Sequence, residues 1–266
     1  MFNFAPTRQR GPAGARGYRA YAVGDIHGRL DLLELLLQRV DEDLRRRPAR
    51  KTLLVFVGDL IDRGPASAQV VERLRTYRRR GVRTVFLLGN HEEVLLRILG
   101  GDASLFPDWL QFGGAECLKS YGVSTRQLRG LPTGEALAIV QRAIPPDHAA
   151  FLNSFLDTCR FGDYLIVHAG IRPGIGLDQQ RQTDLRWIRD PFLLDNTDHG
   201  FVVVHGHTIS SEVEERPNRI GIDTGAYRTG VLTALAIEDC KRWYVDTRTA
   251  VEQEKSGRID SGQFQV

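Results

Sequence analysis

Short polar motifs follow five of the hydrophobic segments of this sequence. They read GDIHG at 24–28, GDLIDRG at 58–64, GNHE at 89–92, HAG at 168–170 and HGHT at 205–208. They offer carboxylate, carboxamide and imidazole groups but no thiolate. One such motif is an ordinary turn or helix start, whereas five in series are hard to explain as turns alone. The set therefore indicates one site that is assembled from several strand ends.

These groups predict a metal centre with more than one ion. Mixed oxygen and imidazole ligands suit Mn²⁺, Fe or Zn²⁺ better than Ca²⁺. The motifs hold more candidate ligands than one ion needs, and two ions about 3.5–4 Å apart, bridged by a carboxylate, would use them all. Such a pair activates water near neutral pH and clamps the oxygens of an in-line displacement at phosphorus.

The elements that must position these motifs alternate in the first half of the chain. Three hydrophobic segments read as strands, at 18–25, 52–59 and 82–90. The two segments between them, 28–47 and 66–80, have the apolar spacing of helices. Asp25 and Asp59 are 34 positions apart and Asp59 and Asn90 are 31 apart, each about one βαβ unit. Parallel strands would place these residues side by side at the carboxyl edge of a sheet, where open α/β folds bind ligands.

The second half predicts a helical region followed by more strands. Residues 91–160 look helical and irregular, without a strand signal. Strands return at 163–170, 201–208, 218–226, 230–238 and 241–247. Because these later strands are closely spaced, we expect a second sheet that is more antiparallel than the first.

Length and composition indicate a single main domain. The 266 residues are 42% hydrophobic, and no linker divides them. We expect a disordered tail over 1–17, one domain over 18–248 and a flexible tail over 249–266. The N-terminal residues lack the apolar core of a secretory signal, and no segment has the roughly 18 apolar residues of a membrane helix. Three cysteines without a CxxC pair fit a reducing compartment, so we expect a cytoplasmic protein without a membrane partner.

Two basic clusters raise the question of nucleic-acid binding. They are RRRPARK at 45–51 and RRRGVR at 78–83, in a chain of formal net charge +3. Each cluster follows a helical segment, where cations are favourable, and no interleaved aromatic residues or known binding motif surround it. We therefore interpret the clusters as solvated helix ends and expect no nucleic-acid partner.

In this order, the five motifs resemble those of the metallophosphoesterases. The DRG in the second motif and the HE in the third are similar to the phosphoprotein phosphatase family, in particular to its compact bacterial and phage serine/threonine phosphatases. IDTGA at 222–226 extends the match. The resemblance implies an α/β calcineurin-like fold: two packed mixed β-sheets flanked by helices as an αββα sandwich, with a small helical cap at about 100–150.

The resemblance also assigns the metal ligands. It implies that two divalent ions are held by Asp25, His27, Asp59, Asn90, His168 and His207. Asp59 would bridge the two ions. His207 is preferred to His205 because the ligand in the family's last motif belongs to its Gly-His-Thr segment. Mn²⁺ is the first candidate metal, with Fe and Zn as alternatives.

The remaining roles concern proton transfer and phosphate binding. By resemblance, His91 is the general acid that protonates the leaving oxygen, and Asp62 orients its imidazole. Arg63 would hold phosphate oxygens with its planar guanidinium. A Trp-x-Arg segment would supply a second phosphate-binding residue, Arg189, with Arg186 as the competing candidate.

The resemblance implies a dinuclear-metal-dependent phosphomonoesterase. Its most similar members are serine/threonine protein phosphatases, with phosphotyrosine as a further candidate substrate, and they use direct attack of a metal-bridging hydroxide on phosphorus. The alternative is a hydrolase of diadenosine tetraphosphate or other nucleotide pyrophosphates, because the same metal site serves both reactions. A non-catalytic phosphate-binding scaffold is disfavoured because no ligand has been lost. We expect a phosphoprotein or a small phosphoester as substrate.

Two features leave the substrate open. The fourth motif is His-Ala-Gly, whereas eukaryotic members of the family have His-Gly-Gly and phage-like members often have His-Ala-Asp. The predicted cap is also longer than a minimal scaffold needs. Within its segment DWLQFGGAECLKSYG, the residues expected to shape the substrate pocket are Trp109, Gln111, Gly113 and Gly114, with a core anchor as the alternative role of Trp109.

Overall fold

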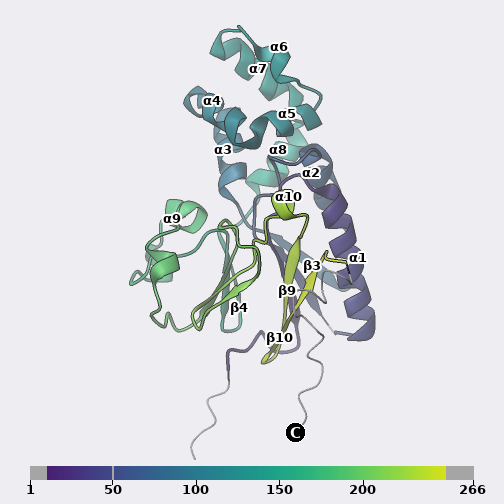
Figure 1. Cartoon of the computed structure of the whole chain (residues 1–266), viewed down its shortest axis with the longest axis vertical. Coiled ribbons are helices and arrows are strands. Elements are labelled where there is room, and N and C mark those ends of the chain that lie inside the picture. The colour runs from purple at the N-terminus through teal and green to yellow at the C-terminus, as the bar shows by residue number, and fades with distance from the viewer. Residues whose placement is uncertain (1–10, 50, 250–266) are drawn as a thin grey trace, which may run out of the picture.

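Two five-stranded β-sheets pack face to face, with helices on their outer faces (Figure 1). The computed structural model describes residues 11–49 and 51–249. The predicted αββα sandwich is thereby confirmed, as is the helical cap, which rises above one end of the two sheets. No helix in the described ranges has the length and apolar character to span a membrane.

The first sheet contains the predicted parallel strands. Its order is β10-β9-β1-β2-β3, with β1 (Arg19–Val23), β2 (Thr52–Phe56) and β3 (Val82–Phe86) parallel to one another. Helices α1 (Leu30–Arg46) and α2 (Ser67–Arg75) make the crossovers. β1 is buried along its whole length: Tyr21 packs in the cluster that contains α1 and Ala22 in the cluster between the sheets. Burial on both faces explains why these strands read as continuous hydrophobic runs.

The second sheet is mixed and differs from the prediction. Its order is β4-β5-β6-β8-β7, where β5 (Tyr164–Val167), β6 (Val202–His205) and β8 (Arg219–Gly221) are parallel neighbours. The antiparallel pair β9 (Thr233–Glu238) and β10 (Lys241–Asp246) returns to the first sheet, where β9 pairs with β1. The expectation that all the later strands form a more antiparallel second sheet is therefore wrong.

Two short edge strands were missed. β4 (Thr158–Phe161) lies at the end of the region that lacked a strand signal, and β7 (Glu214–Glu215) has only two residues. Only Phe161 of β4 is buried. A short edge strand that buries one side chain has no clear alternation, so periodicity cannot detect it.

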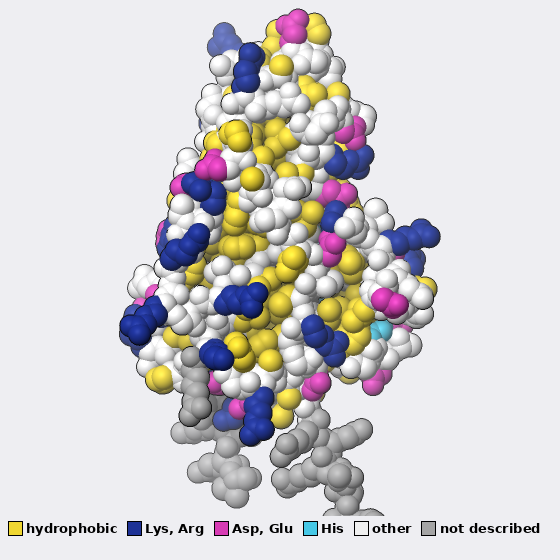
Figure 2. All heavy atoms as spheres, turned by 180° about the vertical axis from the view of Figure 1, so that it is seen from behind, with side chains coloured by type: hydrophobic (Ala, Val, Ile, Leu, Met, Phe, Trp, Pro, Cys, Tyr) yellow, Lys and Arg dark blue, Asp and Glu magenta, His cyan; other side chains and the backbone are white. Residues whose placement is uncertain are grey.

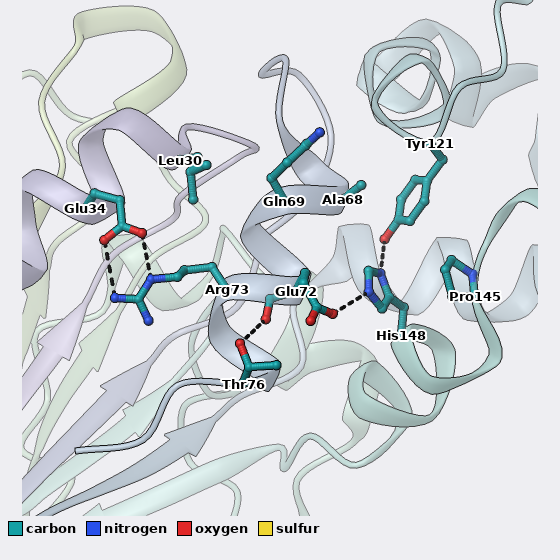
Figure 3. Close-up of a pocket in the computed structure, with 10 residues that line it drawn as sticks. All are labelled: Leu30, Glu34, Ala68, Gln69, Glu72, Arg73, Thr76, Tyr121, Pro145 and His148. Carbon is teal, nitrogen blue, oxygen red and sulfur yellow. Dashed lines mark hydrogen bonds and ion pairs between the residues drawn. The ribbon is translucent and has the colours of Figure 1, made fainter. Parts of the chain in front are cut away.

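The cap is built from short helices between α3 and β4. They follow α3 (Asn90–Leu99) and are α4 (Phe106–Trp109), α5 (Ala115–Ser120), α6 (Thr125–Leu128), α7 (Thr133–Ala143) and α8 (Pro146–Asn153). Figure 3 shows how the cap is fastened to α2 beside a surface cavity of about 530 Å³. The buried His148 has Nε2 3.1 Å from Glu72 Oε2 and Nδ1 3.0 Å from the Tyr121 hydroxyl.

The described part of the N-terminal tail is not loose. The Ala13 N–H donates to Asp163 Oδ2 (2.9 Å), and the Asp163 N–H donates back to the Ala13 carbonyl (2.8 Å). The Gly14 N–H donates to the Asp239 carbonyl (2.7 Å). The prediction of a disordered tail over 1–17 is therefore wrong for these residues. Residues 1–10 and 250–266, which make up the rest of the predicted tails, lie outside the described residues.

The basic clusters lie between the ends of α1 and α2 and the starts of β2 and β3, at the opposite ends of these strands from the polar motifs. Arg79 forms an ion pair with Asp41, and Arg47 forms one with Asp43. On the face opposite to that of Figure 1, Lys and Arg side chains are spread among hydrophobic ones (Figure 2). The Lys and Arg side chains do not form one continuous basic patch on this face.

Candidate metal centre

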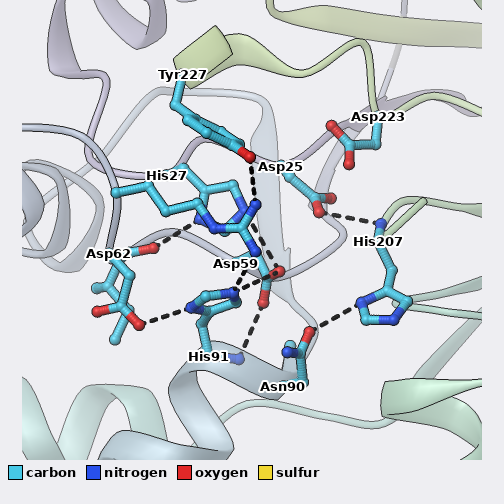
Figure 4. A network of polar contacts seen from close by, with 12 residues as sticks. Asp25, His27, Asp59, Asp62, Asn90, His91, His207, Asp223 and Tyr227 are labelled. Carbon is cyan, nitrogen blue, oxygen red and sulfur yellow. Dashed lines mark hydrogen bonds and ion pairs between the residues drawn. The ribbon is translucent and has the colours of Figure 1, made fainter. Parts of the chain in front are cut away.

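The polar motifs meet at the carboxyl ends of the parallel strands, below the cap. Asp59, just beyond β2, lies at the centre of the cluster (Figure 4). Its Oδ2 is 3.5 Å from His27 Nε2, and its Oδ1 is 3.5 Å from His168 Nε2. Two groups of candidate ligand atoms, each within 4.8 Å of one another, share this carboxylate: His27, Asp59 and His91, and Asp59, His168 and His207.

The remaining predicted ligands close the cluster. Asn90 Oδ1 lies 3.0 Å from His168 Nε2 and 2.9 Å from His207 Nδ1. Asp25 Oδ2 accepts a hydrogen bond from the His207 N–H (3.0 Å). The structure thus brings together all six residues that sequence reasoning placed at the metals, and each is at most 8% exposed.

Backbone strain is concentrated at the same motifs. Among the described residues, six non-glycine residues have positive φ, and five belong to the motifs: His27, Asp59, Asp62, Arg63 and His207. Left-handed backbone is unfavourable for such side chains and is retained where the surroundings fix it. Gly206 permits a further close approach, since a Cβ there would lie 2.0 Å from Asp25 Oδ1.

The histidines are held in the form that binds metal. His27 Nδ1 and His168 Nδ1 each lie 2.9 Å from a backbone carbonyl, of Ile61 and Val57 respectively. A carbonyl only accepts, so both rings carry the proton on Nδ1 and turn the Nε2 lone pair towards Asp59. Burial lowers the pKa of His27 to about 3. Burial and the charge of His168 lower the pKa of His207 to about 3. These imidazoles are therefore neutral at physiological pH.

Unpaired polar atoms show that the cluster fits divalent cations. Among the described residues, Asp25 Oδ1, His207 Nε2 and Asp223 Oδ2 are buried without a hydrogen-bond partner. Buried polar atoms of this kind are unfavourable unless a partner compensates them. Carboxylates, a carboxamide oxygen and neutral imidazoles around one shared carboxylate are a donor set for two such ions.

Binding of Mn²⁺ to the metal-free protein is expected to release protons at about pH 6. Burial, reinforced by the charges of Asp223 and Asp59, raises the pKa of Asp25 well above its usual value, and burial raises the pKa of Asp223 to about 6. A carboxyl group with a raised pKa keeps its proton until a cation expels it, so the affinity for the ion must rise with pH. Calorimetric titration in two buffers of different ionisation enthalpy measures the release. Equal heats would contradict the prediction.

Asp62 and His91 form a separate pair beside the cluster. His91 Nδ1 lies 2.6 Å from Asp62 Oδ2, and both side chains are buried. Burial alone would lower the pKa of His91, but the charge of Asp59 and the hydrogen bond that Nδ1–H donates to Asp62 raise it to about 9. An imidazolium with Nδ1 held by a carboxylate carries an acidic proton on Nε2. That nitrogen lies 3.2 Å from Arg63 Nη2, and because a guanidinium N–H only donates, this contact is a hydrogen bond only while Nε2 is unprotonated.

The two candidate phosphate-binding arginines differ in their surroundings. Arg63 donates from Nη1 to the Tyr227 hydroxyl (2.6 Å), and its guanidinium stacks 4.7 Å from the centre of that ring. Arg189 is exposed, and its charge contributes to lowering the pKa of His168 and His207, which burial lowers most. The competing Arg186 is instead held by Asp157 (2.7 Å) and Glu93 (3.4 Å). These contacts favour Arg189.

Three residues at the site have no role in the sequence-based prediction: Glu92 and Asp223, which lie in the motifs GNHE and IDTGA, and Tyr227. Asp223 follows β8, and the rule that strand ends carry the site could have found it. Glu92 is the third residue of α3, the usual position for a capping glutamate. Tyr227 gives no sequence signal, because its contact with Arg63 joins residues 164 positions apart.

Glu92 holds the site loops through backbone hydrogen bonds. Fully buried, it accepts from the N–H groups of Asp59 (2.8 Å), Leu60 (2.8 Å) and Gly89 (3.1 Å). Glu92→Ala leaves these donors buried and unpaired, and is expected to lower the free energy of unfolding by about 3 kcal/mol. Urea denaturation measures the loss. Glu93→Ala, on the same helix, is the control and should cost about 1 kcal/mol or less; similar losses would contradict the role of Glu92.

Comparisons with known proteins agree with this geometry. The family model of the calcineurin-like phosphoesterases matches residues 18–230. Serine/threonine-protein phosphatase 1 of Salmonella typhimurium is 31% identical, over 84% of this chain and 94% of that protein. An asymmetrical bis(5'-nucleosyl)-tetraphosphatase of Anoxybacillus flavithermus is 29% identical, over 90% of this chain and 98% of that protein.

A solved structure shares the fold. A cold-active protein tyrosine phosphatase superposes with a TM-score of 0.54 at 18% identity, covering 87% of this chain and 79% of that chain. At this identity the similarity concerns the fold alone. One of the two relatives above is named as a protein phosphatase and the other as a bis(5'-nucleosyl)-tetraphosphatase, so the comparisons leave the substrate open.

Proposed function

Since the chain belongs to the calcineurin-like phosphoesterase family, we propose that this metal-dependent phosphoesterase removes phosphate from phosphoserine and phosphothreonine in proteins. The Asp62–His91 pair carries the proposal. A serine or threonine alkoxide is a poor leaving group and must be protonated as it departs, and a carboxylate-held imidazolium is suited to this task. Phosphotyrosine is a second substrate of the same chemistry.

The ligand roles follow from the cluster. We assign Asp25, His27, Asp59, Asn90, His168 and His207 to two divalent ions, with Mn²⁺ as the first candidate and Asp59 shared between the ions. Bound divalent ions supply Lewis-acid activation of water and neutralise charge on the phosphoryl group. Asn90 Oδ1, between His168 and His207, adds a neutral oxygen donor to this set.

The other residues bind the phosphoryl group and move a proton. We assign Arg63 and Arg189 to the phosphoryl oxygens, where planar guanidinium groups form paired hydrogen bonds. Tyr227 fixes the Arg63 guanidinium by stacking and by its hydroxyl. His91 gives its Nε2 proton to the leaving oxygen, while Asp62 keeps the Nδ1 proton in place. We place this activity in the cytoplasm, without a nucleic-acid or membrane partner.

A second candidate function is hydrolysis of dinucleoside tetraphosphates. The similarity to a bis(5'-nucleosyl)-tetraphosphatase over 90% of this chain supports it. Its leaving group is a nucleotide phosphate, which needs less help from an acid than an alkoxide does. The two functions therefore differ in how strongly they depend on His91.

A substrate panel tests the proposal. The purified protein with added Mn²⁺ is assayed on peptides containing phosphoserine, phosphothreonine or phosphotyrosine, on p-nitrophenyl phosphate and on diadenosine tetraphosphate. We expect the highest kcat/KM on the phosphopeptides. Activity confined to the dinucleotide would overturn the proposal in favour of the second candidate. The Asp59→Asn variant, purified in parallel, controls for contaminating phosphatases.

A further inference from the structure

One side chain of the cap reaches the acid pair. Trp109, the last residue of α4, is 3% exposed, and its Nε1–H donates to Asp62 Oδ2 (3.0 Å). The same oxygen lies 2.6 Å from His91 Nδ1. One carboxylate oxygen is therefore held between a donor on the scaffold helix α3 and a donor on the cap.

Asp62 has few other constraints on its carboxylate. Its second oxygen, Oδ1, is buried without a hydrogen-bond partner among the described residues. The residue is fully buried, and its backbone N–H donates to Ser67 Oγ (3.0 Å) rather than to its own side chain. The buried Cys117 thiol also lies near Asp62, and burial together with the charge of Asp62 raises the thiol's pKa, but the hydrogen bonds that orient Oδ2 come from His91 and Trp109.

The turn after Trp109 is shaped to fit against the DRG motif. The Gly113 carbonyl accepts a hydrogen bond from the Arg63 N–H (3.1 Å), and a Cβ on Gly113, whose φ is +114°, would lie 2.5 Å from that nitrogen. A Cβ on Gly114 would lie 2.3 Å from the Trp109 ring. The glycine pair therefore lets one cap segment touch both Asp62 and Arg63.

The cap is fixed on its other side, which makes this contact rigid. The Ala68 N–H of α2 donates to Ser120 Oγ of α5 (2.9 Å). His148 of α8 bridges Glu72 of α2 and Tyr121, as Figure 3 shows. The hydrogen bonds between the cap and α2 therefore hold the part of the chain that carries Trp109 in place.

We propose that Trp109 is a positioning residue for proton transfer: its indole N–H fixes the Asp62 carboxylate so that His91 presents Nε2 to the leaving oxygen. The inference rests on the proposed role of His91 as the acid. A core anchor fills space, and any aromatic ring of suitable size performs that task. A positioning residue needs the N–H, and this difference separates the two roles.

The test is Trp109→Phe, which keeps a ring and removes the donor. We expect kcat on a phosphoserine peptide to fall about tenfold, the loss of one hydrogen bond to a charged group. On p-nitrophenyl phosphate, whose leaving group needs little protonation, kcat should change less than about twofold. KM should stay constant on both. Trp243→Phe is the matched control, because Trp243 Nε1 donates to Asp43 Oδ2 at 3.1 Å outside the site.

A double variant tests whether Trp109 acts through His91. His91→Asn combined with Trp109→Phe should be no slower on the phosphopeptide than His91→Asn alone, since Trp109 acts through His91. Equal losses on both substrates in Trp109→Phe, or additive losses in the double variant, would overturn the inference. If the wild-type protein hydrolyses no phosphoester, the proposed function fails first, before any variant is compared.

A spectroscopic readout does not depend on activity or on the folding of Trp109→Phe. In the ¹⁵N-labelled protein, the Trp109 indole N–H resonance should shift in Asp62→Asn, while the indole resonances of Trp187 and Trp243 should not. A Trp109 resonance that is unmoved by Asp62→Asn would exclude the hydrogen bond and with it the inference.

Discussion

His91→Asn is expected to slow hydrolysis of a phosphoserine peptide by about 10²–10⁴-fold, but hydrolysis of p-nitrophenyl phosphate by less than about tenfold. The serine alkoxide must gain a proton as the bond to phosphorus breaks, and the nitrophenolate need not. In the structure, His91 is the buried imidazole that a carboxylate holds by Nδ1, at 2.6 Å from Asp62. Asparagine keeps a similar volume and polarity but has no acidic proton to give.

Steady-state kinetics on the two substrates, with saturating Mn²⁺, measure this selectivity. Asp62→Asn should show the same preference with a smaller loss, because it disturbs the orientation of His91 without removing the ring. Equal losses on the two substrates would count against His91 as the acid. They would indicate that the residue binds metal instead, since its Nε2 lies 4.0 Å from Asp59 Oδ2.

Asp59→Asn is expected to lower kcat/KM on every phosphoester by at least about 10³-fold, which corresponds to several kcal/mol of stabilisation by the metal centre. Asp59 offers one oxygen to the group that contains His27 and the other to the group that contains His168. A carboxamide supplies a single weaker oxygen, so it cannot serve both positions with a full negative charge.

Metal analysis gives a second readout for this variant. The wild-type protein should hold two Mn²⁺ per chain after gel filtration, and Asp59→Asn should hold one or fewer. Asp198→Asn is the control: Asp198 is exposed and accepts a hydrogen bond from the Gly200 N–H (2.8 Å) in a loop. An Asp59→Asn protein with two bound ions and nearly full activity would refute the bridging role.

Much of the site was predictable because each predicted ligand lies in a motif that follows a hydrophobic strand. The parallel pairing of β1, β2 and β3 turns sequence intervals of one βαβ unit into spatial neighbours, which explains how Asp25, Asp59 and Asn90 meet. This inference needs only the strand ends and their direction. It does not require any knowledge of the side-chain packing.

Contacts that form only in the folded chain could not be predicted. Tyr227 and Arg63 come from distant parts of the sequence, and no local pattern links them. The pairing of β9 with β1 depends on which sheet edge is available, which local propensity does not encode. The sequence predicts a disordered tail at residues 13 and 14, yet their backbone groups find partners in Asp163 and Asp239.

The contact between the cap segment Trp109–Gly114 and the site has a consequence for how this phosphoesterase can be altered. The cap meets the site motifs through residues of its proximal part, such as Trp109 and Gly113, whereas α7 packs on the far side against α3. Exposed residues of these outer helices, such as Arg126 of α6 and Glu135 of α7, can therefore be changed without touching His91 or Arg63. The exposed outer cap and the buried reaction centre are thus separate parts of the chain, and shortened or grafted outer caps are natural starting points for altering substrate preference.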